Sequence, residues 1–589
     1  MNMNSYKIDE QQVKKSNFET MPRLFKYLLK YKKRIALVLL MMAFGTTIDL
    51  INPLLTELAV DKYIMPGDIA GLIKIVIIGA VLNTLAVFAI KFRMLIMAKT
   101  SNKVIQELRQ QLYDHIQSLD LAFFDSRPSG KILARIIGDT NSLKDIIENS
   151  VTTLIPNLIT VVAVIVIMFI KNWRLAIASL CSLPFLIAGI FLISTMAEKH
   201  WKAKRQKSSN MNAFINEDLS GIKIIQSFRA EDETDKTFRN LVHEDRQEFI
   251  KAVRWCDAFG SWIDLCWSVG TMCLYLVGIR FIGIEGVSIG TYIAFGSYVG
   301  MFWQPIMNLS NFYNQFINAA SGAERIFEII DTEKTVKDKE GAGVLPPMNG
   351  DVRFDKVTFG YADEVDVLKN VSFDVKAGET IALVGPTGAG KSTVVNLISR
   401  FYDVKDGAIL IDGYDVRDVT IESLRTQMGV MTQDSYIFSG TIRENIMYGK
   451  LDATEEEMLA ASKAVHADDF IQKLEKGYDT KLTARGGELS NGQRQLVAFA
   501  RTMLSNPRIL ILDEATSSID TKTELLVQAG IAQMLKGRTS FVIAHRLSTI
   551  QNADRIFVID QGGIIESGSP AELMEKKGAY YKLRQAQFS

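Results

Sequence analysis

The sequence predicts a multidomain membrane protein, in which an all-α six-helix transmembrane domain precedes an α/β domain. Its 589 residues are too many for one hydrophobic core. Long apolar stretches occur in the first 330 residues, and short β-branched runs alternate with helix-forming segments after them. We therefore expect a polar N-terminal tail at 1–20, a membrane domain at 21–330, a linker at 331–350 and the α/β domain at 351–589.

The N-terminal tail is polar and lacks the apolar segment and cleavage site of a secretory signal. Residues 21–33 combine Leu and Phe with five Lys or Arg residues. A helix of this composition lies at an anionic membrane surface, and its positive charges favour the cytoplasmic side. We therefore expect the N-terminus in the cytoplasm.

Six stretches approach the roughly 20 apolar residues that a helix needs to cross a bilayer. They lie near residues 35–55, 72–96, 151–170, 175–196, 258–282 and 289–312. Residues 158–170 carry no charge, which argues against a buried helix of a soluble protein. Charged, helix-forming segments of about 50 to 60 residues separate spans two and three and spans four and five, and we expect them to extend into the cytoplasm. An even number of spans also returns the C-terminal domain to the cytoplasm.

Three Gly and two Pro residues between positions 341 and 350 mark the linker. The domain that follows alternates helical stretches with short apolar or β-branched runs, which predicts a largely parallel sheet. These runs are 371–375, 380–384, 408–411, 509–512 and 540–543.

A glycine-rich loop follows the run 380–384, and a helix-forming segment that begins with Thr393 follows the loop. The loop consists of Gly385, Pro386, Thr387, Gly388, Ala389, Gly390, Lys391 and Ser392. Backbone N–H groups of such a loop surround phosphates, the lysine reaches the β- and γ-phosphates, and the serine can bind Mg²⁺. The strand before the loop and the helix after it disfavour the alternative of a structural glycine turn. The sequence thus predicts a P-loop nucleotide-binding domain that uses ATP and Mg²⁺.

Two acids, Asp513 and Glu514, end the apolar run 509–512. One carboxylate can hold Mg²⁺ through water, and the next can orient or deprotonate the water that attacks the γ-phosphate. Acids after an apolar run are a weak signal alone and a strong one beside a phosphate-binding loop. We take Asp513 as a magnesium ligand and Glu514 as the general base.

Charge and cysteine content exclude some classes of function. The formal net charge of +1 provides no field that would recruit nucleic acid, so we expect no nucleic-acid partner. The cysteines lie in or beside apolar stretches without a CxxC pair, so we expect neither a zinc site nor disulfides. They are Cys181, Cys256, Cys266 and Cys273.

Residues 352–589 resemble an ATP-binding-cassette domain, and residues 21–330 more loosely resemble the six-span domain of the multidrug-type exporters of that family. The motifs occur in the family's order and approximate spacing at 385–392, Gln433, 489–493, 513–514, 517–520 and 544–546. Looser matches lie at 124–130 and 221–231. The resemblance implies one half of an ATP-driven exporter, a multi-pass protein of a bacterial cytoplasmic membrane.

The resemblance also implies roles for single residues. Tyr361 would stack on adenine; the alternative is that it is an ordinary tyrosine of a strand. Gln433 would sense Mg²⁺ and the γ-phosphate, His545 would contact the γ-phosphate, and Asp520 would bridge two nucleotide domains. The signature that contacts the partner's ATP would comprise Ser490, Asn491, Gly492 and Gln493. Short helices near 123–125 and 217–222 would rest on the nucleotide domains.

The sequence departs from the family at two places that serve the partner's ATP. Asn491 replaces the usual glycine of the signature, and its side chain stands where backbone N–H groups approach the γ-phosphate. Thr483 and Ala484 replace a common Gly-Glu pair. Because the phosphate loop and Glu514 are intact, the pattern resembles a heterodimer in which this chain supplies the catalytic glutamate. Its partner would have a degenerate Walker B motif and an intact signature; a homodimer that tolerates asparagine is the alternative.

Ionisable and aromatic residues within the spans are candidates for a binding site for lipophilic or amphipathic substrates, because charges in a bilayer are costly. They are Asp49, Asp264, Trp262, Trp267 and Trp303. Aromatic residues of spans also serve as packing or interface anchors.

Three functional classes remain. The first is an active exporter of drug-like compounds. A homodimeric exporter of lipids or peptides is the alternative within this class. The second is an ATP-gated channel or regulator, which intact Glu514 argues against. The third, a soluble P-loop ATPase that acts on nucleic acid, conflicts with six spans and balanced charge.

Overall fold

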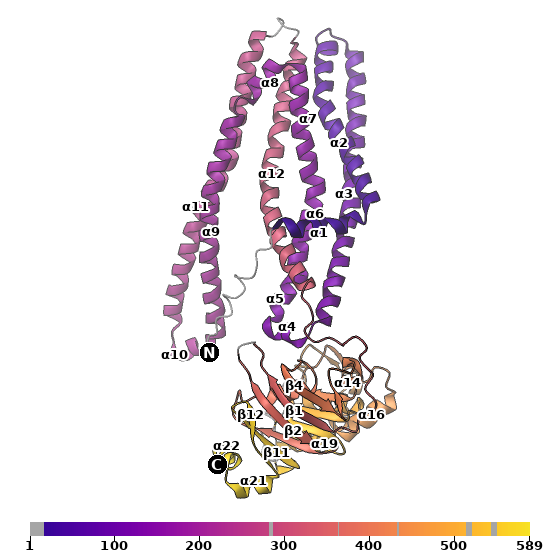
Figure 1. Cartoon of the computed structure of the whole chain (residues 1–589). Coiled ribbons are helices and arrows are strands. Elements are labelled where there is room, and N and C mark those ends of the chain that lie inside the picture. Colours follow the sequence, from indigo (N-terminus) through magenta and orange to yellow (C-terminus); the bar gives the residue numbers. More distant parts are fainter. Residues whose placement is uncertain are drawn as a thin grey trace. The chain divides into compact units, whose positions relative to one another are not determined.

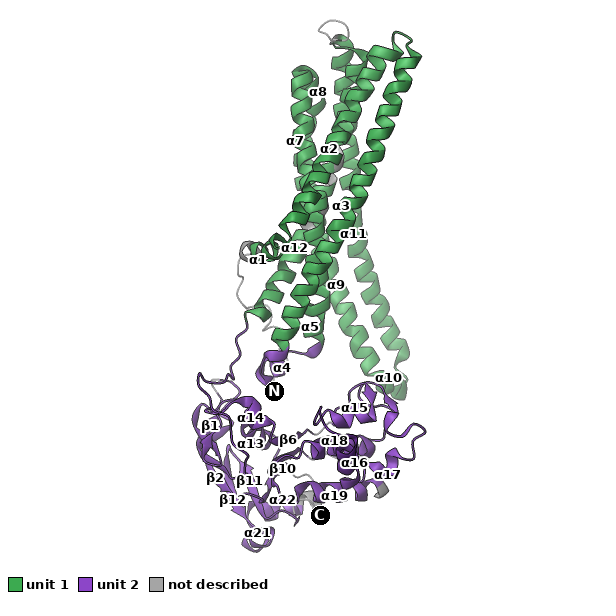
Figure 2. Cartoon of the chain, turned by 90° about the vertical axis from the view of Figure 1, so that its right-hand side faces the viewer, with its two compact units in different colours: residues 1–116, 130–331 green, residues 117–129, 332–589 purple. Residues whose placement is uncertain are grey.

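The computed structural model describes residues 17–281, 287–362, 365–432, 435–513, 521–543 and 551–588. The chain forms two compact units, which Figure 2 colours separately. The first comprises residues 1–116 and 130–331, and the second comprises residues 117–129 and 332–589. A short segment between the second and third predicted spans therefore belongs with the α/β domain.

The first unit is built from helices, several of them very long (Figure 1). The α-helices are α1 (Asn17–Leu29), α2 (Lys32–Ala59), α3 (Ile69–Ser118), α5 (Ser129–Ala134), α6 (Thr140–Asn149), α7 (Ile155–Lys171), α8 (Trp173–Leu180), α9 (Leu183–Ser220), α10 (Ile222–Phe228), α11 (Glu231–Phe281) and α12 (Ile289–Ile330). Three π-helical turns, η2 (Val60–Ile64), η3 (Arg135–Asp139) and η4 (Ser150–Leu154), continue helices without breaking them.

Among the described residues, five helical segments are long and apolar enough to cross a membrane. They are Lys32–Ile64, Ile69–Ser118, Ser129–Lys171, Trp173–Ser220 and Glu231–Arg280. Helix α12 is 42 residues long and covers the place of the sixth predicted span. The prediction of a helical transmembrane domain is confirmed.

Large apolar side chains on these helices are exposed within the unit, for example Ile77 at 56%, Phe88 at 52% and Phe191 at 76%. Such exposure would be unfavourable in water, but it suits lipid tails or a second helical subunit. The exposed apolar surface therefore supports a membrane environment.

The core of the first unit lies where α7, α11 and α12 pack, and Met168, Leu274 and Phe295 are buried in it. Glu57 at the end of α2 accepts hydrogen bonds from Lys171 of α7 at 2.9 Å and from Thr291 of α12 at 2.8 Å. An ion pair that is also hydrogen-bonded is far less costly than an isolated charge near a bilayer. These contacts hold three helices together at one end.

The second unit contains a six-stranded sheet in the order β12-β11-β3-β10-β9-β6. Its strands are β3 (Thr380–Val384), β6 (Met428–Met431), β9 (Ile509–Asp513), β10 (Thr539–Ile543), β11 (Arg555–Asp560) and β12 (Gly563–Gly568). All neighbours pair in parallel except β12, which is antiparallel to β11. Strands β3 and β10 are buried at every residue, as expected for the centre of a parallel sheet.

Two of the runs predicted for the parallel sheet instead belong to an antiparallel sheet in the order β2-β1-β4-β5. Its strands are β1 (Val352–Phe359), β2 (Leu368–Val375), β4 (Asp406–Ile411) and β5 (Tyr414–Asp415). No helix is present in the described residues between β1 and β2, so these strands pair as antiparallel neighbours. The prediction was wrong for the runs 371–375 and 408–411.

The remaining elements of the second unit are mainly helices. They are α4 (Leu121–Ser126), α13 (Lys391–Ile398), α14 (Ile421–Arg425), α15 (Ile442–Met447), α16 (Glu455–Ala464), α17 (Asp468–Ile471), α18 (Asn491–Leu504), α19 (Thr521–Leu535), α21 (Pro570–Lys576) and α22 (Ala579–Phe588), with the short strands β7 (Gly440–Thr441) and β8 (Lys481–Leu482). One hydrophobic cluster joins the antiparallel sheet, β3 and α13, and another joins α15, α16, α18 and α19. The α/β fold class is confirmed.

Candidate functional site

The glycine-rich loop forms the turn between β3 and α13, as predicted from the sequence. Gly385 has φ +152°, and a Cβ there would lie 2.1 Å from the carbonyl oxygen of Ile559 in β11. Gly390 has φ +108°, and a Cβ there would lie 2.9 Å from a methyl group of Leu368. Both positions require glycine because an L side chain would be strained and would collide. The loop is thus fixed at its start and at its end.

Lys391 places its ammonium group against its own loop. The Nζ atom donates hydrogen bonds to the carbonyl oxygens of Gly385 at 2.8 Å and Pro386 at 2.9 Å. Burial lowers the pKa of Lys391, and the negative charge of Asp513 opposes that shift. Phosphate oxygens are stronger acceptors for an ammonium group than carbonyl oxygens, so this position suits the phosphates of a nucleotide.

Asp513 is the last residue of β9, at the carboxyl edge of the parallel sheet. Because β3 and β9 both pair in parallel with β10, the loop after β3 and Asp513 lie at the same edge of the sheet. Ser392, in the first turn of α13, is exposed. A hydroxyl and a carboxylate beside a phosphate loop form the oxygen donor set that Mg²⁺ prefers, and these two residues would hold it.

Tyr361 lies beside the first turns of α13, with 51% of its surface exposed. Its ring contacts Phe359 and Tyr402 edge to face, each with 5.1 Å between ring centroids. Its hydroxyl oxygen lies 3.2 Å from Thr393 Oγ1 in α13. The ring is therefore oriented on three sides and still accessible, as a stacking platform for a base requires.

The signature region starts α18. Ser490 caps this helix: its hydroxyl accepts from the backbone N–H of Gln493 at 3.3 Å, and its own N–H donates to Gln493 Oε1 at 2.9 Å. Asn491 accepts a hydrogen bond from Arg494, which also donates to the Leu489 carbonyl at 3.1 Å. The asparagine side chain is therefore held by its own helix, and Gly492 behind it is buried.

Helix α4 belongs to the second unit through specific contacts. Phe123 is 4% exposed, and Leu121 and Ala122 pack against the core of the antiparallel sheet and α13. Tyr402 donates a hydrogen bond to Asp125. Burial raises the pKa of Tyr402, and the hydrogen bond to Asp125 adds to that effect. The helix predicted near 123–125 thus rests on the nucleotide-binding domain.

Several predicted site residues lie outside the described part of the chain. They are Gln433, Glu514, Asp520 and His545. Their roles stay predictions. The loop residues Pro386, Thr387 and Gly388 are exposed, whereas Ala389 is buried.

The candidate substrate residues lie on different helices. Asp49 of α2 is exposed and interacts electrostatically with Arg93 of α3. Asp264 and Trp267 of α11 are exposed, and they lie one turn apart. Trp262 packs closely on α9, where a Cβ at Gly189 would lie 1.9 Å from its ring nitrogen. The side chain of Trp303 lies outside the described residues.

Sequence reasoning missed three residues next to the site: Asp120, Arg400 and Tyr402. Asp120 caps α4 by accepting from the backbone N–H of Phe123, and an Asp before an apolar run is a recognisable helix start. Arg400 and Tyr402 follow α13 directly. The bond from Arg400 to Lys337 spans 63 residues and the bond from Tyr402 to Asp125 spans 277, so no local pattern indicates these two contacts.

Comparisons with known proteins agree with this architecture. Residues 35–306 match the family described as ABC transporter transmembrane region, and residues 368–517 match the family described as ABC transporter. A bacterial Atm1-family ABC exporter solved with ATP bound is 29% identical, with a TM-score of 0.76 over 95% of this chain and 98% of that one.

Curated relatives match along nearly the whole chain. An uncharacterized ABC transporter ATP-binding protein of Bacillus subtilis (strain 168) is 41% identical over 99% of this chain and 97% of its own length. An ATP-dependent lipid A-core flippase of Syntrophus aciditrophicus (strain SB) is 34% identical over 96% and 94%. A putative multidrug export ATP-binding/permease protein of Staphylococcus aureus (strain NCTC 8325) is 34% identical over 95% and 98%.

Substitution Gly385→Ala tests the geometry of the loop. We expect it to reduce ATP affinity at least tenfold, because the new methyl group would collide with the Ile559 carbonyl. Gly378→Ala is the matched control: Gly378 also has positive φ, at +84°, but a Cβ there meets nothing within 4 Å. The control should lose about 1–2 kcal/mol of stability and keep its ATP affinity. Equal ATP affinities of the two variants, measured by calorimetry, would contradict the assignment.

Substitution Tyr361→Ala tests the base platform. Loss of a stacked base costs about 1–3 kcal/mol, so the dissociation constant for ATP should rise about 5- to 150-fold. Tyr361→Phe keeps the ring and loses only the hydroxyl contacts with Thr393 and Asn396, so it should bind ATP within about threefold of the parent. Inorganic triphosphate, which has no base, should bind all three proteins alike. A weaker affinity of Tyr361→Ala for triphosphate would show that the ring only supports the loop.

Proposed function

Since this chain belongs to the ABC transporter family, and is built as an exporter half, we propose that its cargo is a lipophilic or amphipathic compound. The nucleotide-binding domain binds ATP, and the hydrolysis of ATP is coupled to transport across the membrane that the helices span. We place the protein in a bacterial cytoplasmic membrane, with its N-terminus and its nucleotide-binding domain in the cytoplasm. Transport by alternating access would then carry the cargo outward.

The observation that carries the proposal is the geometry around Lys391. A glycine loop with left-handed backbone, a half-buried ammonium group and the acid at the end of β9 lie at one edge of the sheet. Ser392 and Asp513 would hold Mg²⁺, which would neutralise charge on the phosphates when bound. Lys391 would bind and orient the phosphates, and Tyr361 would orient the base. Glu514, the residue after Asp513, would take the proton of the attacking water.

Exposed groups on α11 support an amphipathic cargo. Asp264 and Trp267 present a carboxylate and an aromatic ring of a span to the surroundings of this chain. An acid beside an aromatic ring suits a cation attached to an apolar body. Asp49 is a weaker candidate for a cationic cargo, because Arg93 already offsets its charge. The named relatives include a putative multidrug exporter, which is consistent with this class of cargo.

We further propose that the transporter is a heterodimer in which this chain carries the catalytic glutamate. In this family the signature of one half completes the ATP site of the other. Asn491 is bonded to Arg494 of its own helix and occupies the position of a glycine, so it alters only the partner's site. The side that serves this chain's own ATP keeps its phosphate loop and Glu514.

A homodimeric lipid exporter is the second candidate, because a relative of similar identity is named a lipid A-core flippase. In that case both ATP sites would be equivalent and would both contain asparagine. Flipping of a fluorescent phospholipid by vesicles that hold only this chain would favour this candidate. Transport of a lipophilic cationic dye only by the two-chain complex would favour the first.

Substitution Glu514→Gln tests the general base. We expect ATP turnover to fall about 100-fold or more, because proton transfer contributes at least that factor, while ATP binding stays within about twofold. Phosphate release and nucleotide binding are measured on the same purified protein. The control is Glu566→Gln, since Glu566 instead accepts hydrogen bonds from the backbone N–H groups of Ala579 and Tyr580 in α22. Near-normal hydrolysis by Glu514→Gln would refute the assignment.

The heterodimer predicts that a differently sequenced half co-purifies with this chain in a ratio of about one to one. Mass spectrometry of the intact complex measures the ratio. Asn491→Gly should then change turnover less than about twofold, because Asn491 faces the slower ATP site. An active homodimer from cells that express only this gene, with turnover raised by Asn491→Gly, would overturn the prediction.

A further inference from the structure

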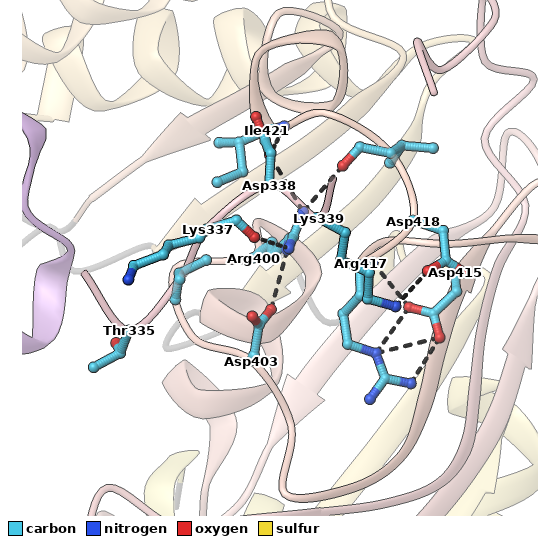
Figure 3. A network of polar contacts seen from close by, with 12 residues as sticks. Thr335, Lys337, Asp338, Lys339, Arg400, Asp403, Asp415, Arg417, Asp418 and Ile421 are labelled. Carbon is cyan, nitrogen blue, oxygen red and sulfur yellow. Dashed lines mark hydrogen bonds and ion pairs between the residues drawn. The ribbon is translucent and has the colours of Figure 1, made fainter. Parts of the chain in front are cut away.

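Part of the segment expected to be a linker, residues 331–350, is bonded to the nucleotide-binding domain. We call residues 335–339 the strap; Figure 3 shows it beside Arg400 and the acids around it. The Lys337 carbonyl accepts a hydrogen bond from Arg400 Nη2 at 3.0 Å, and Asp338 accepts one from the Ile421 backbone N–H at 2.9 Å. Lys339 forms an ion pair with Asp418. The strap is therefore bonded at three consecutive residues.

Arg400 anchors the strap to the end of α13. Only 1% of its surface is exposed, and its backbone has φ +49°. Besides Lys337, its guanidinium binds the Val419 carbonyl at 3.0 Å and Asp403 at 3.0 Å. A buried guanidinium is stable only when its donors are paired, so this side chain holds a fixed position. Helix α13 begins at the phosphate loop, and Arg400 thus connects that helix with the strap.

Asp120 attaches the other end of the strap to α4. Its Oδ2 atom accepts hydrogen bonds from the Thr335 backbone N–H and from Thr335 Oγ1, each at 2.6 Å, and its Oδ1 atom accepts from Phe123 N of α4. Burial alone would raise the pKa of Asp120, but the bonds from Thr335, Val336 and Phe123 together hold it below its ordinary value. One carboxylate therefore joins α4 and the strap.

The contacts close a ring. From α13 the ring runs through Arg400 to the strap, through Asp120 to α4, and through Asp125 to Tyr402, two residues after Arg400. The Tyr402 ring also contacts Tyr361 at 5.1 Å between centroids. Two covalent connections leave this ring. The strap follows α12, which ends at Ile330, and α4 follows α3, which ends at Ser118.

We propose that the strap is a mechanical linkage, with Asp120 as the positioning residue that makes α4 and the end of α12 move together when ATP displaces α13. If the chain after α12 were flexible, the nucleotide-binding domain could move without moving the end of α12. A strap bonded to α13 and α4 transmits the displacement to two membrane helices, α3 and α12, within the same chain. ATP binding itself does not depend on the strap, because none of its residues belongs to the nucleotide site.

Substitution Asp120→Ser tests the linkage, because serine still caps α4 but is too short to reach the strap as well. Thr335→Val is a second variant, which removes one donor and leaves the cap intact. Lys337→Ala is the matched control: it changes a strap residue but keeps the carbonyl that Arg400 binds. Each variant is purified as the complete transporter and placed in vesicles of phosphatidylethanolamine and phosphatidylglycerol.

The readout is the distance between spin labels at Gln110 of α3 and Asn210 of α9, both exposed, in a background without the native cysteines. It is measured without nucleotide and with ATP and vanadate, alongside ATP affinity. We expect Asp120→Ser to bind ATP within about twofold of the parent and to lose at least half of the ATP-dependent shift in distance. Thr335→Val should lose a smaller part, and Lys337→Ala none.

A full shift in both Asp120→Ser and Thr335→Val would overturn the linkage. So would a tenfold loss of ATP affinity in these variants, because the strap would then support the nucleotide site itself. If the parent protein shows no ATP-dependent shift, the proposed alternating access fails, and the role of the strap fails with it. A full shift in the parent with a reduced shift in the variants supports both.

Discussion

The close contact between Gly385 and the Ile559 carbonyl is the constraint on which the nucleotide site depends. Strand β3 is paired on one side with β10 and on the other with β11, so the end of β3 is held between two neighbouring strands. The chain must turn there against β11, in a conformation that only glycine adopts easily. The position of the phosphate loop is therefore set by the sheet and not by the loop alone. Because β9 pairs with β10 in the same sheet, Asp513 is brought to the same edge.

Helix α13 connects the phosphate loop with the strap and with α4. Its first turn holds Lys391 and Ser392, and the residues just after its last turn hold the strap and α4. The helix packs into the core that the side chains of both sheets form, through the buried residues Val394, Leu397 and Ile398. It should therefore move as a rigid body. When the phosphates move the first turn of α13 by a few tenths of an ångström, the last turn should move by a similar amount, because packed cores deform little.

The sequence alone was sufficient to predict a structural feature wherever one short continuous segment encodes that feature. The phosphate loop, the acid at the end of β9 and the membrane spans are each encoded within about 25 residues by glycines, a terminal acid or an apolar run. The antiparallel sheet was missed because the runs of β1, β2 and β4 look the same whichever sheet they join. The contacts of Asp120 and Tyr402 were missed because their partners lie 215 and 277 residues away. Glu514 was predicted as the general base from its neighbours in sequence, and it lies outside the described residues.

The arrangement of cores explains how the two sides of one nucleotide-binding domain can differ. One hydrophobic cluster, which includes Leu383, Val394 and Ile409, supports the phosphate loop, Tyr361 and the strap. The signature helix α18 is supported by a separate cluster, which includes Leu496, Phe499 and Met458. In the proposed heterodimer, Asn491 and the segment around Thr483 would therefore change the surface offered to the partner's ATP and leave the packing under this chain's own phosphate loop unaltered. Such independence permits one half of a transporter to keep hydrolytic chemistry while its signature diverges, because substitutions without shared contacts have nearly additive effects.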